Sequence, residues 1–161
     1  MNRTLHLRQA LPEDATRILE IEISCFGEDA FTRRQVRYLI SRAKGLCLVV
    51  ACGKDIAGCM SVLTNNRHSN ARIYSIAIAT GYRRRGLAGF LVDRAVDFAR
   101  QAGLASVSLE VRVDNTAALA LYKKKGFTAL SVKQAYYHDG TNACRMALSI
   151  GTAGTVRHIL S

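Results

Sequence analysis

The sequence predicts a mixed α/β fold, and three patterns along the chain carry this prediction. A nearly continuous apolar run at Ile73–Ile78 is followed by a turn rich in arginine and glycine, and then by apolar residues at helical spacing up to Gly103. That order is typical of a strand, a turn and a long helix. Two apolar segments flank a short polar turn at residues 53–55 and predict a β-hairpin. Two further strand-like segments, at Phe127–Val132 and Ala143–Ile150, predict a closing antiparallel pair.

In the first half of the chain, the residues that favour helix starts set the expected boundaries. Pro12 is suited to a first helical turn, and Thr32 is suited to the cap position before a second helix. The expected elements are, in order, a strand at Thr4–Leu7, a helix from Pro12 to about Ser24, a loop at Ser24–Ala30, a helix from Thr32 to about Lys44, and hairpin strands at Cys47–Ala51 and Ile56–Leu63.

The second half is expected to continue with strands and two helices. The run at Ile73–Ile78 is typical of a strand covered on both faces, and Gly103 is suited to a left-handed helix C-cap. The expected elements are a polar loop at Asn65–Asn70, the strand at Ile73–Ile78, a helix from Leu87 to Gly103, a strand at Ala105–Val113, a helix at Asn115–Lys125 ended by Gly126, and antiparallel strands at Phe127–Val132 and Ala143–Ile150.

Length and composition agree with one domain at residues 1–150 and a mobile tail at 151–161. The 161 residues contain a single proline and no glycine- and serine-rich linker. No apolar run reaches the roughly 18 residues of a membrane span, and the N-terminus lacks the apolar core of a secretory signal, so a cytoplasmic protein is expected. Five cysteines without a CxxC pair predict reduced thiols, and four histidines without metal-ligand spacing predict no metal site.

Three consecutive arginines, Arg83–Arg85, precede the long helix, where they are electrostatically unusual. A helix N-terminus already carries about half a positive charge, so further cations there favour a bound anion. The backbone N–H groups of residues 84–89 could bind a pyrophosphate, because Gly86, Ala88 and Gly89 let the backbone approach closely. The alternative is a solvated basic turn, since neither GxxxxGK[ST] nor GxGxxG is present.

Three motifs in the right order resemble those of the GNAT superfamily of acyl-CoA N-acyltransferases. The pattern RxxGxA at residues 83–88 matches the Q/R-x-x-G-x-G/A signature of its phosphate loop, although Ala88 replaces the commoner second glycine. Residues 108–127 resemble its LEVR…N…A…LY…GF block. Residues 136–140 and 143–146 resemble the YY…DG…A…M ending of the branch that acetylates protein N-termini, which includes the bacterial ribosomal-protein alanine N-acetyltransferases.

The resemblance implies the fold, the cosubstrate and most of the site. The fold would be a central mixed, mostly antiparallel sheet flanked by helices, and acetyl-CoA would be the cosubstrate, with no metal. Backbone groups near the end of the fourth strand would hold the pantetheine arm and stabilise the tetrahedral intermediate. The implied coenzyme-binding residues are Ile76, Ala77, Ile78, Arg83, Arg84, Arg85, Gly86, Leu87, Ala88, Gly89, Asn115 and Tyr122, and the implied acceptor-binding residues are Cys25, Phe26, Tyr136 and Tyr137.

Glu110 is the candidate general base. Aliphatic and polar residues alternate over Val107–Val113, so the carboxylate lies on the face opposite the aliphatic row. On spacing alone, this carboxylate is equally suited to an ion pair with Arg72, Arg112 or another cation. The resemblance implies instead that it deprotonates the acceptor amine through water. An α-amine has a pKa near 8 and must lose a proton before it attacks at neutral pH.

Tyr122 is the candidate general acid by the same resemblance, which implies that its phenol faces the thioester sulfur. A phenol with a pKa near 10 stays protonated at neutral pH and can protonate the departing thiolate. The alternative is a tyrosine that only packs against Phe127. Asn115 is suited to cap the helix that follows, and the resemblance adds a contact with the coenzyme arm.

The net charge of +11 leaves the acceptor and the rival functions open. Such a surface fits an acidic peptide, or an enzyme that operates near ribosomal RNA. The first expectation is the N-terminal α-amine of a protein, and the resemblance implies a ribosomal one. A small-molecule amine or a lysine side chain is the alternative within the family. A basic nucleic-acid- or ribosome-binding module without catalysis is the alternative of another class.

Overall fold

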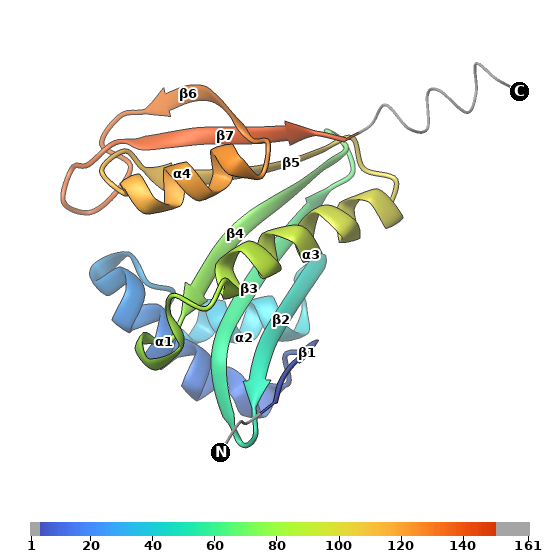
Figure 1. Cartoon of the computed structure of the whole chain (residues 1–161), viewed down its shortest axis with the longest axis vertical. Helices are drawn as coiled ribbons and strands as arrows, with labels where there is room; N and C mark the ends of the chain where they lie inside the picture. Colours follow the sequence, from blue (N-terminus) through green and yellow to red (C-terminus); the bar gives the residue numbers. More distant parts are fainter. Residues whose placement is uncertain (1–3, 151–161) are drawn as a thin grey trace, which may run out of the picture. The chain divides into compact units, whose positions relative to one another are not determined.

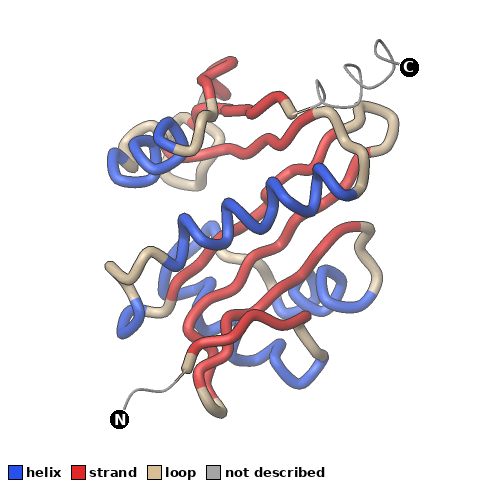
Figure 2. Tube along the Cα trace, turned by 45° about the vertical axis from the view of Figure 1, so that its right-hand side comes forward, coloured by secondary structure: helices blue, strands red, loops and turns tan. Residues whose placement is uncertain are grey.

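The computed structural model describes residues 4–150, and the chain falls into two compact units. The first comprises residues up to 63 together with Tyr74–Leu91, and the second comprises Thr64–Ile73 together with residues from 92 onward. Figure 1 follows the elements by colour along the chain, and Figure 2 separates helices from strands. The single domain expected at 1–150 stays a prediction, and the expected tail at 151–161 lies outside the described residues.

Seven strands and four α-helices lie within residues 4–150. The strands are β1 (Leu5–Gln9), β2 (Gly45–Cys52), β3 (Asp55–Asn65), β4 (Asn70–Ile78), β5 (Ser106–Arg112), β6 (Thr128–Lys133) and β7 (Ala143–Ser149). The α-helices are α1 (Ala15–Phe26), α2 (Arg33–Ser41), α3 (Leu87–Gln101) and α4 (Thr116–Lys124), and short 3₁₀ turns occur at η1 (Pro12–Asp14), η2 (Gly27–Asp29) and η3 (Thr80–Tyr82).

The strands form one sheet in the order β1-β2-β3-β4-β5-β7-β6. β4 and β5 pair in parallel, whereas the pairs β1–β2, β2–β3, β5–β7 and β6–β7 are antiparallel. This confirms the predicted mixed, mostly antiparallel sheet flanked by helices. The hairpin expected around residues 53–55 is the β2–β3 pair, and the closing antiparallel pair is β6–β7.

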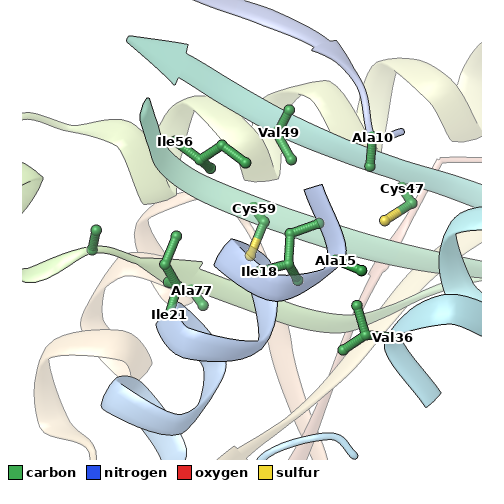
Figure 3. Packing of buried hydrophobic residues seen from close by; sticks show 11 residues of the cluster. Ala10, Ala15, Ile18, Ile21, Val36, Cys47, Val49, Ile56, Cys59 and Ala77 are labelled. Carbon is green, nitrogen blue, oxygen red and sulfur yellow. The ribbon is translucent and has the colours of Figure 1, made fainter. Parts of the chain in front are cut away.

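The core of the first unit lies between two helices and one face of its strands. Ile18 and Ile21 of α1 and Val36 of α2 point toward the strands (Figure 3). The strand residues that they meet come from β2, β3 and β4, and they are Cys47, Val49, Ile56, Cys59 and Ala77. The apolar residues at helical spacing in the first half of the chain therefore form this core.

The first helix differs from its prediction at both ends. Pro12 opens a 3₁₀ turn, and the α-helix starts only at Ala15. At the other end α1 continues to Phe26, so the loop expected at Ser24–Ala30 is wrong for Cys25 and Phe26. These two side chains are therefore placed by the last turn of a helix.

The second helix begins as predicted and ends early. Thr32 caps it, because its hydroxyl accepts from the Gln35 N–H at 3.2 Å while the Gln35 side chain accepts from the Thr32 N–H at 2.8 Å. Such a reciprocal pair is a capping box, which satisfies two of the N–H groups that a helix start leaves unpaired. The helix ends at Ser41 rather than near Lys44.

One prediction about β4 is wrong. Ile73 and Ala77 are buried, but Tyr74 is 38% exposed, so the strand is not covered evenly on both faces. The Tyr74 ring stacks on Phe31, with ring centroids 5.1 Å apart and planes 7° apart. A tyrosine counts as apolar in a sequence pattern, yet it commonly lies at a partly exposed site because its hydroxyl prefers water.

The second unit packs aliphatic residues on one face of β5 and β7. Val107, Leu109 and Val111 alternate along β5 and are buried, together with Met146 of β7 and Phe127 before β6. Figure 1 shows α4 beside these strands. Asn115 caps α4 as predicted, because its side-chain oxygen accepts from the Ala118 N–H at 3.2 Å. No helix within the described residues combines the length and apolar character needed to cross a membrane.

Glu22 is a buried carboxyl group in the first unit, only 3% exposed, on the side of α1 that contacts β4. The Ser75 hydroxyl donates a hydrogen bond to it. Burial raises the pKa of Glu22 from its ordinary value near 4.5 to about 7, and the bond from Ser75 opposes that rise only in part. At neutral pH the folded protein therefore holds a carboxyl group that resists ionisation.

Replacement of Glu22 by glutamine should make stability less dependent on pH. Between pH 4.5 and 7 the folded protein binds the Glu22 proton more tightly than the unfolded chain does, so stability falls as pH rises. We expect the free energy of unfolding of Glu22→Gln to rise by about 2 to 3 kcal/mol relative to that of the parent protein between pH 5 and pH 8. Urea unfolding at the two pH values measures this difference. An equal pH dependence of the two proteins would contradict the assignment.

Candidate active site

The turn before α3 has a backbone suited to an anion. Gly86 has a φ of +76° and Arg84 has a φ of +63°, which places both residues in the left-handed region. A non-glycine residue there costs roughly 1 kcal/mol or more, and such strain is concentrated at ligand sites and switches. The Phe90 N–H bonds to the Gly86 carbonyl, so the helix begins directly after Gly86. The N–H groups of residues 87–89 consequently have no acceptor inside the helix.

The arginine side chains of this turn are partly engaged within the first unit. The Arg83 guanidinium donates to the Ile78 carbonyl at 3.3 Å and to the Cys25 sulfur at 3.5 Å. Arg85 lies over the Tyr82 ring, with its guanidinium carbon 5.4 Å from the centroid. The Arg83 side chain therefore links the end of β4 to the last turn of α1. The coenzyme contact expected of Arg83 stays a prediction.

Cys25 and Phe26, the acceptor-binding candidates on α1, have different surroundings. The Cys25 thiol donates to the Ile78 carbonyl at 3.4 Å, and all five cysteines of the chain are free thiols. Phe26 is 39% exposed. The sequence pattern missed the stack of Phe31 on Tyr74 beside them, because a contact between residues so far apart depends on how β4 packs under the helices.

The end of β4 offers backbone groups for a ligand. β4 is in register with β5 only from Asn70 to Ile73, opposite Ser106 to Leu109. Within the described residues, that register stops at Ile73 and does not include residues 76–78. A strand edge without a partner presents N–H and C=O groups that an extended ligand can pair with. The candidates Ile76, Ala77 and Ile78 all lie in this stretch.

Glu110 is on the polar face of β5, as its alternation predicts, and its side chain is only 8% exposed. One carboxylate oxygen accepts from the Arg72 guanidinium at 2.9 Å, and the other lies 3.1 Å from the Lys133 ammonium. The ion pair with Arg72 was one of the alternatives open from the sequence. Arg112, the other named alternative, pairs with Asp114 at 3.1 Å and with Asp139 at 2.5 Å.

Tyr136 and Tyr137 are linked to the Glu110 ion pairs within the second unit. The Arg72 guanidinium also donates to the Tyr136 hydroxyl at 3.1 Å, and Lys133 lies 5.5 Å from the centre of the Tyr136 ring. The two tyrosine rings meet edge to face, with centroids 5.0 Å apart. Sequence reasoning missed Lys133, since only the register of β6 on β7 brings it to Glu110.

Tyr122 lies on α4 and packs against Phe127, with ring centroids 6.1 Å apart. The packing alternative is therefore present, and it does not exclude a catalytic role. Burial raises the pKa of the Tyr122 phenol above its ordinary value near 10, because the phenolate loses hydration. At neutral pH the group remains a proton donor.

Comparison with known proteins connects these features. Residues 15–127 match the sequence pattern of the Acetyltransferase (GNAT) family, a range that contains the turn before α3, Glu110 and Tyr122. The chain belongs to the GNAT acetyltransferase family. This confirms the resemblance on which the candidate residues were chosen. Tyr136 and Tyr137 lie beyond the matched range.

The relatives of this GNAT chain include protein N-terminal acetyltransferases. It is 39% identical over 83 residues to the ribosomal protein bS18-alanine N-acetyltransferase of Escherichia coli, which covers 50% of this chain and 56% of that enzyme. The chain thus spans little more than half of that relative. It is also 32% identical over 148 residues to the N-alpha-acetyltransferase RimI of Mycobacterium tuberculosis, which covers 86% of this chain and 88% of that protein.

Solved structures agree with this placement. The crystal structure of the ribosomal-protein-S18-alanine N-acetyltransferase from E. coli matches with a TM-score of 0.81 and 25% identity, over 91% of this chain and 94% of that one. Ard1 from Thermoplasma volcanium matches with a TM-score of 0.81 and 26% identity, over 91% and 97%. The GNAT fold therefore covers almost all of the described residues.

Proposed function

We propose that this protein transfers an acetyl group from acetyl-CoA to the N-terminal α-amine of a protein. The observation that carries the proposal is the connection of Glu110 to Tyr136 through Arg72 and Lys133. It ties the candidate base to the tyrosine pair that resembles the protein-acetylating branch. The names of the relatives at 39% and 32% identity support the same acceptor class.

The sites for the pyrophosphate and the pantetheine arm are assigned to the first unit, whereas Asn115 and Tyr122, the two other coenzyme-binding candidates, lie in the second unit. The N–H groups of residues 87–89 at the start of α3 would bind the pyrophosphate, and the left-handed Gly86 would let the backbone turn toward it. The main chain of residues 76–78, which lies beyond the register with β5, would hold the pantetheine arm by hydrogen bonds. An N–H group near Ile78 would stabilise the negative charge on the thioester oxygen during attack.

Proton transfer is assigned to the second unit. Glu110 would accept a proton from the acceptor α-ammonium through water, and the free nitrogen would then attack the acetyl carbonyl. As the tetrahedral intermediate breaks down, the nitrogen loses its second proton, the amide forms and the carbon–sulfur bond breaks. Tyr122 would protonate the departing thiolate, because its buried phenol is still protonated at neutral pH. The second proton from the nitrogen would replace the one that Tyr122 gives to the sulfur. Asn115 caps α4 and so fixes the helix that carries Tyr122.

The acceptor class is tested by thiol release from acetyl-CoA with three acceptors at equal concentration. The first is a ribosomal-type peptide with a free N-terminal alanine, the second is the same peptide with a formylated α-amine, and the third is a polyamine. We expect rapid release with the first and little with the others. Equal rates with the free and the blocked peptide would indicate a lysine side chain as the acceptor. A preference for the polyamine would indicate a small-molecule acceptor.

A further inference from the structure

The polar face of the sheet in the second unit carries more cations than Glu110 can neutralise. Glu110 on β5 lies directly opposite Arg145 on β7 in the strand register. Residues opposite each other in an antiparallel pair project to the same face, with Cβ atoms about 5 Å apart. Arg72 and Lys133 contact the Glu110 carboxylate from β4 and β6. Three cations therefore surround one carboxylate.

Arg145 differs from the other two cations. Its side chain is exposed, and no acidic partner for it is found within residues 4–150. The nearby acidic pair, Asp114 and Asp139, binds Arg112 instead. The contacts from Arg72 and Lys133 already orient the Glu110 carboxylate. A third cation on this face is therefore not needed to position it. Arg145 has positive charge available for a group from outside the unit.

The position of this excess charge indicates what it would bind. If Glu110 receives the proton of the acceptor α-amine, the first residues of the acceptor chain pass over this face. A carboxylate among them would be attracted to the cations, while an arginine or lysine would be repelled. The partly exposed side chains of Arg72 and Lys133, at 34% and 41%, extend the positive surface from Arg145.

We propose that this enzyme prefers protein N-termini with acidic side chains at the second and third positions, and that Arg145 is a specificity-determining residue for them. The inference rests on the proposed function. It adds the chemical class of the acceptor sequence, which neither the family nor the names of the relatives specify. The occupant is an acidic peptide segment, bound by charge complementarity at the face around Glu110.

The test compares three peptides with the same N-terminal alanine and the same length. Their second and third residues are Asp-Glu, Asn-Gln or Arg-Lys, and kcat/KM is measured at low and at physiological salt. We expect the acidic peptide to exceed the neutral one by about 5- to 10-fold at low salt, given the modest strength of exposed charge pairs. The advantage should shrink at higher salt because exposed charges are screened.

Two variants separate Arg145 from a general effect of charge. Arg145→Gln should lower the ratio of acidic to neutral kcat/KM by about 3-fold, and Arg145→Glu should reduce it further. Arg100→Gln removes an exposed cation from the end of α3 and should leave the ratio unchanged. Circular dichroism checks that each variant is folded.

The possible outcomes are distinct. Equal rates for the three peptides, or a preference for Arg-Lys, would overturn the specificity while leaving acetylation of α-amines intact. An unchanged ratio in Arg145→Gln would overturn the role of Arg145. If a short RNA inhibits the enzyme and the three peptides react equally well, this face would be a nucleic-acid-binding surface. That result would overturn the inference. Absence of transfer to all three peptides would overturn both this inference and the proposed function.

Discussion

Replacement of Gly86 by glutamate should abolish binding of acetyl-CoA. Gly86 has a φ of +76°, a conformation that L side chains rarely adopt, so any side chain there introduces backbone strain of roughly 1 kcal/mol or more. The glutamate adds a negative charge directly before the N–H groups of residues 87–89, where a pyrophosphate would lie. Calorimetric titration with acetyl-CoA measures the loss, which we expect to exceed about 100-fold in Kd.

Two control variants separate the effect of charge in this turn from the effects of backbone strain and of charge elsewhere. A Cβ at Gly86 meets nothing within 4 Å, so Gly86→Ala introduces strain without a clash and should weaken binding far less. Gly103 has a φ of +73° just after the opposite end of α3, and a Cβ there also meets nothing within 4 Å. Gly103→Glu therefore introduces a similar backbone strain and the same charge at a position away from the turn before α3. Normal coenzyme binding by folded Gly86→Glu would place the phosphate site elsewhere.

Replacement of Glu110 by glutamine should lower kcat/KM for peptide acetylation by about 100-fold at pH 7, the usual order for loss of a general base. Glutamine keeps the size of the side chain and can still accept from Arg72, but it cannot take a proton. The deficit should shrink toward pH 9, because an α-amine with a pKa near 8 is then mostly neutral without help. Initial rates at both pH values with one peptide measure it.

The control for this variant is Glu13→Gln, which removes an exposed carboxylate at the first 3₁₀ turn. It should leave kcat/KM within about 2-fold, as surface substitutions away from functional groups do. Affinity for acetyl-CoA should be unaffected by Glu110→Gln, since Glu110 is not among the residues assigned to coenzyme binding. A Glu110→Gln enzyme with the rate of the parent would remove Glu110 from the mechanism.

Local signals in the sequence predicted much of the fold. Thr32 and Asn115 cap helices because their side chains satisfy N–H groups within three residues, a contact that needs no tertiary information. The alternation in β5 placed Glu110 opposite the aliphatic row for the same reason. Cys25 was assigned to a loop instead of a helix, because helix ends depend on packing as much as on the residues themselves.

The contacts that define the site could not be predicted in the same way. Arg72 reaches Glu110 across 38 residues, and Ser75 reaches Glu22 across 53. Such pairs depend on strand register, and a shift of one residue would turn each side chain to the other face. The sequence left Arg72 as one of several partners for Glu110, and it contained no signal for Lys133 or Arg145. These residues carry the inference about the acceptor sequence.

The most direct test of the proposed function locates the acetyl group on a peptide that offers both kinds of amine. The peptide begins with a free alanine and carries one internal lysine, and it is incubated with the protein and acetyl-CoA. Tandem mass spectrometry then assigns the added acetyl group to one nitrogen. We expect acetylation of the α-nitrogen by the parent protein and no acetylation by Gly86→Glu. Acetylation of the lysine alone, or an unmodified peptide, would contradict the proposed function.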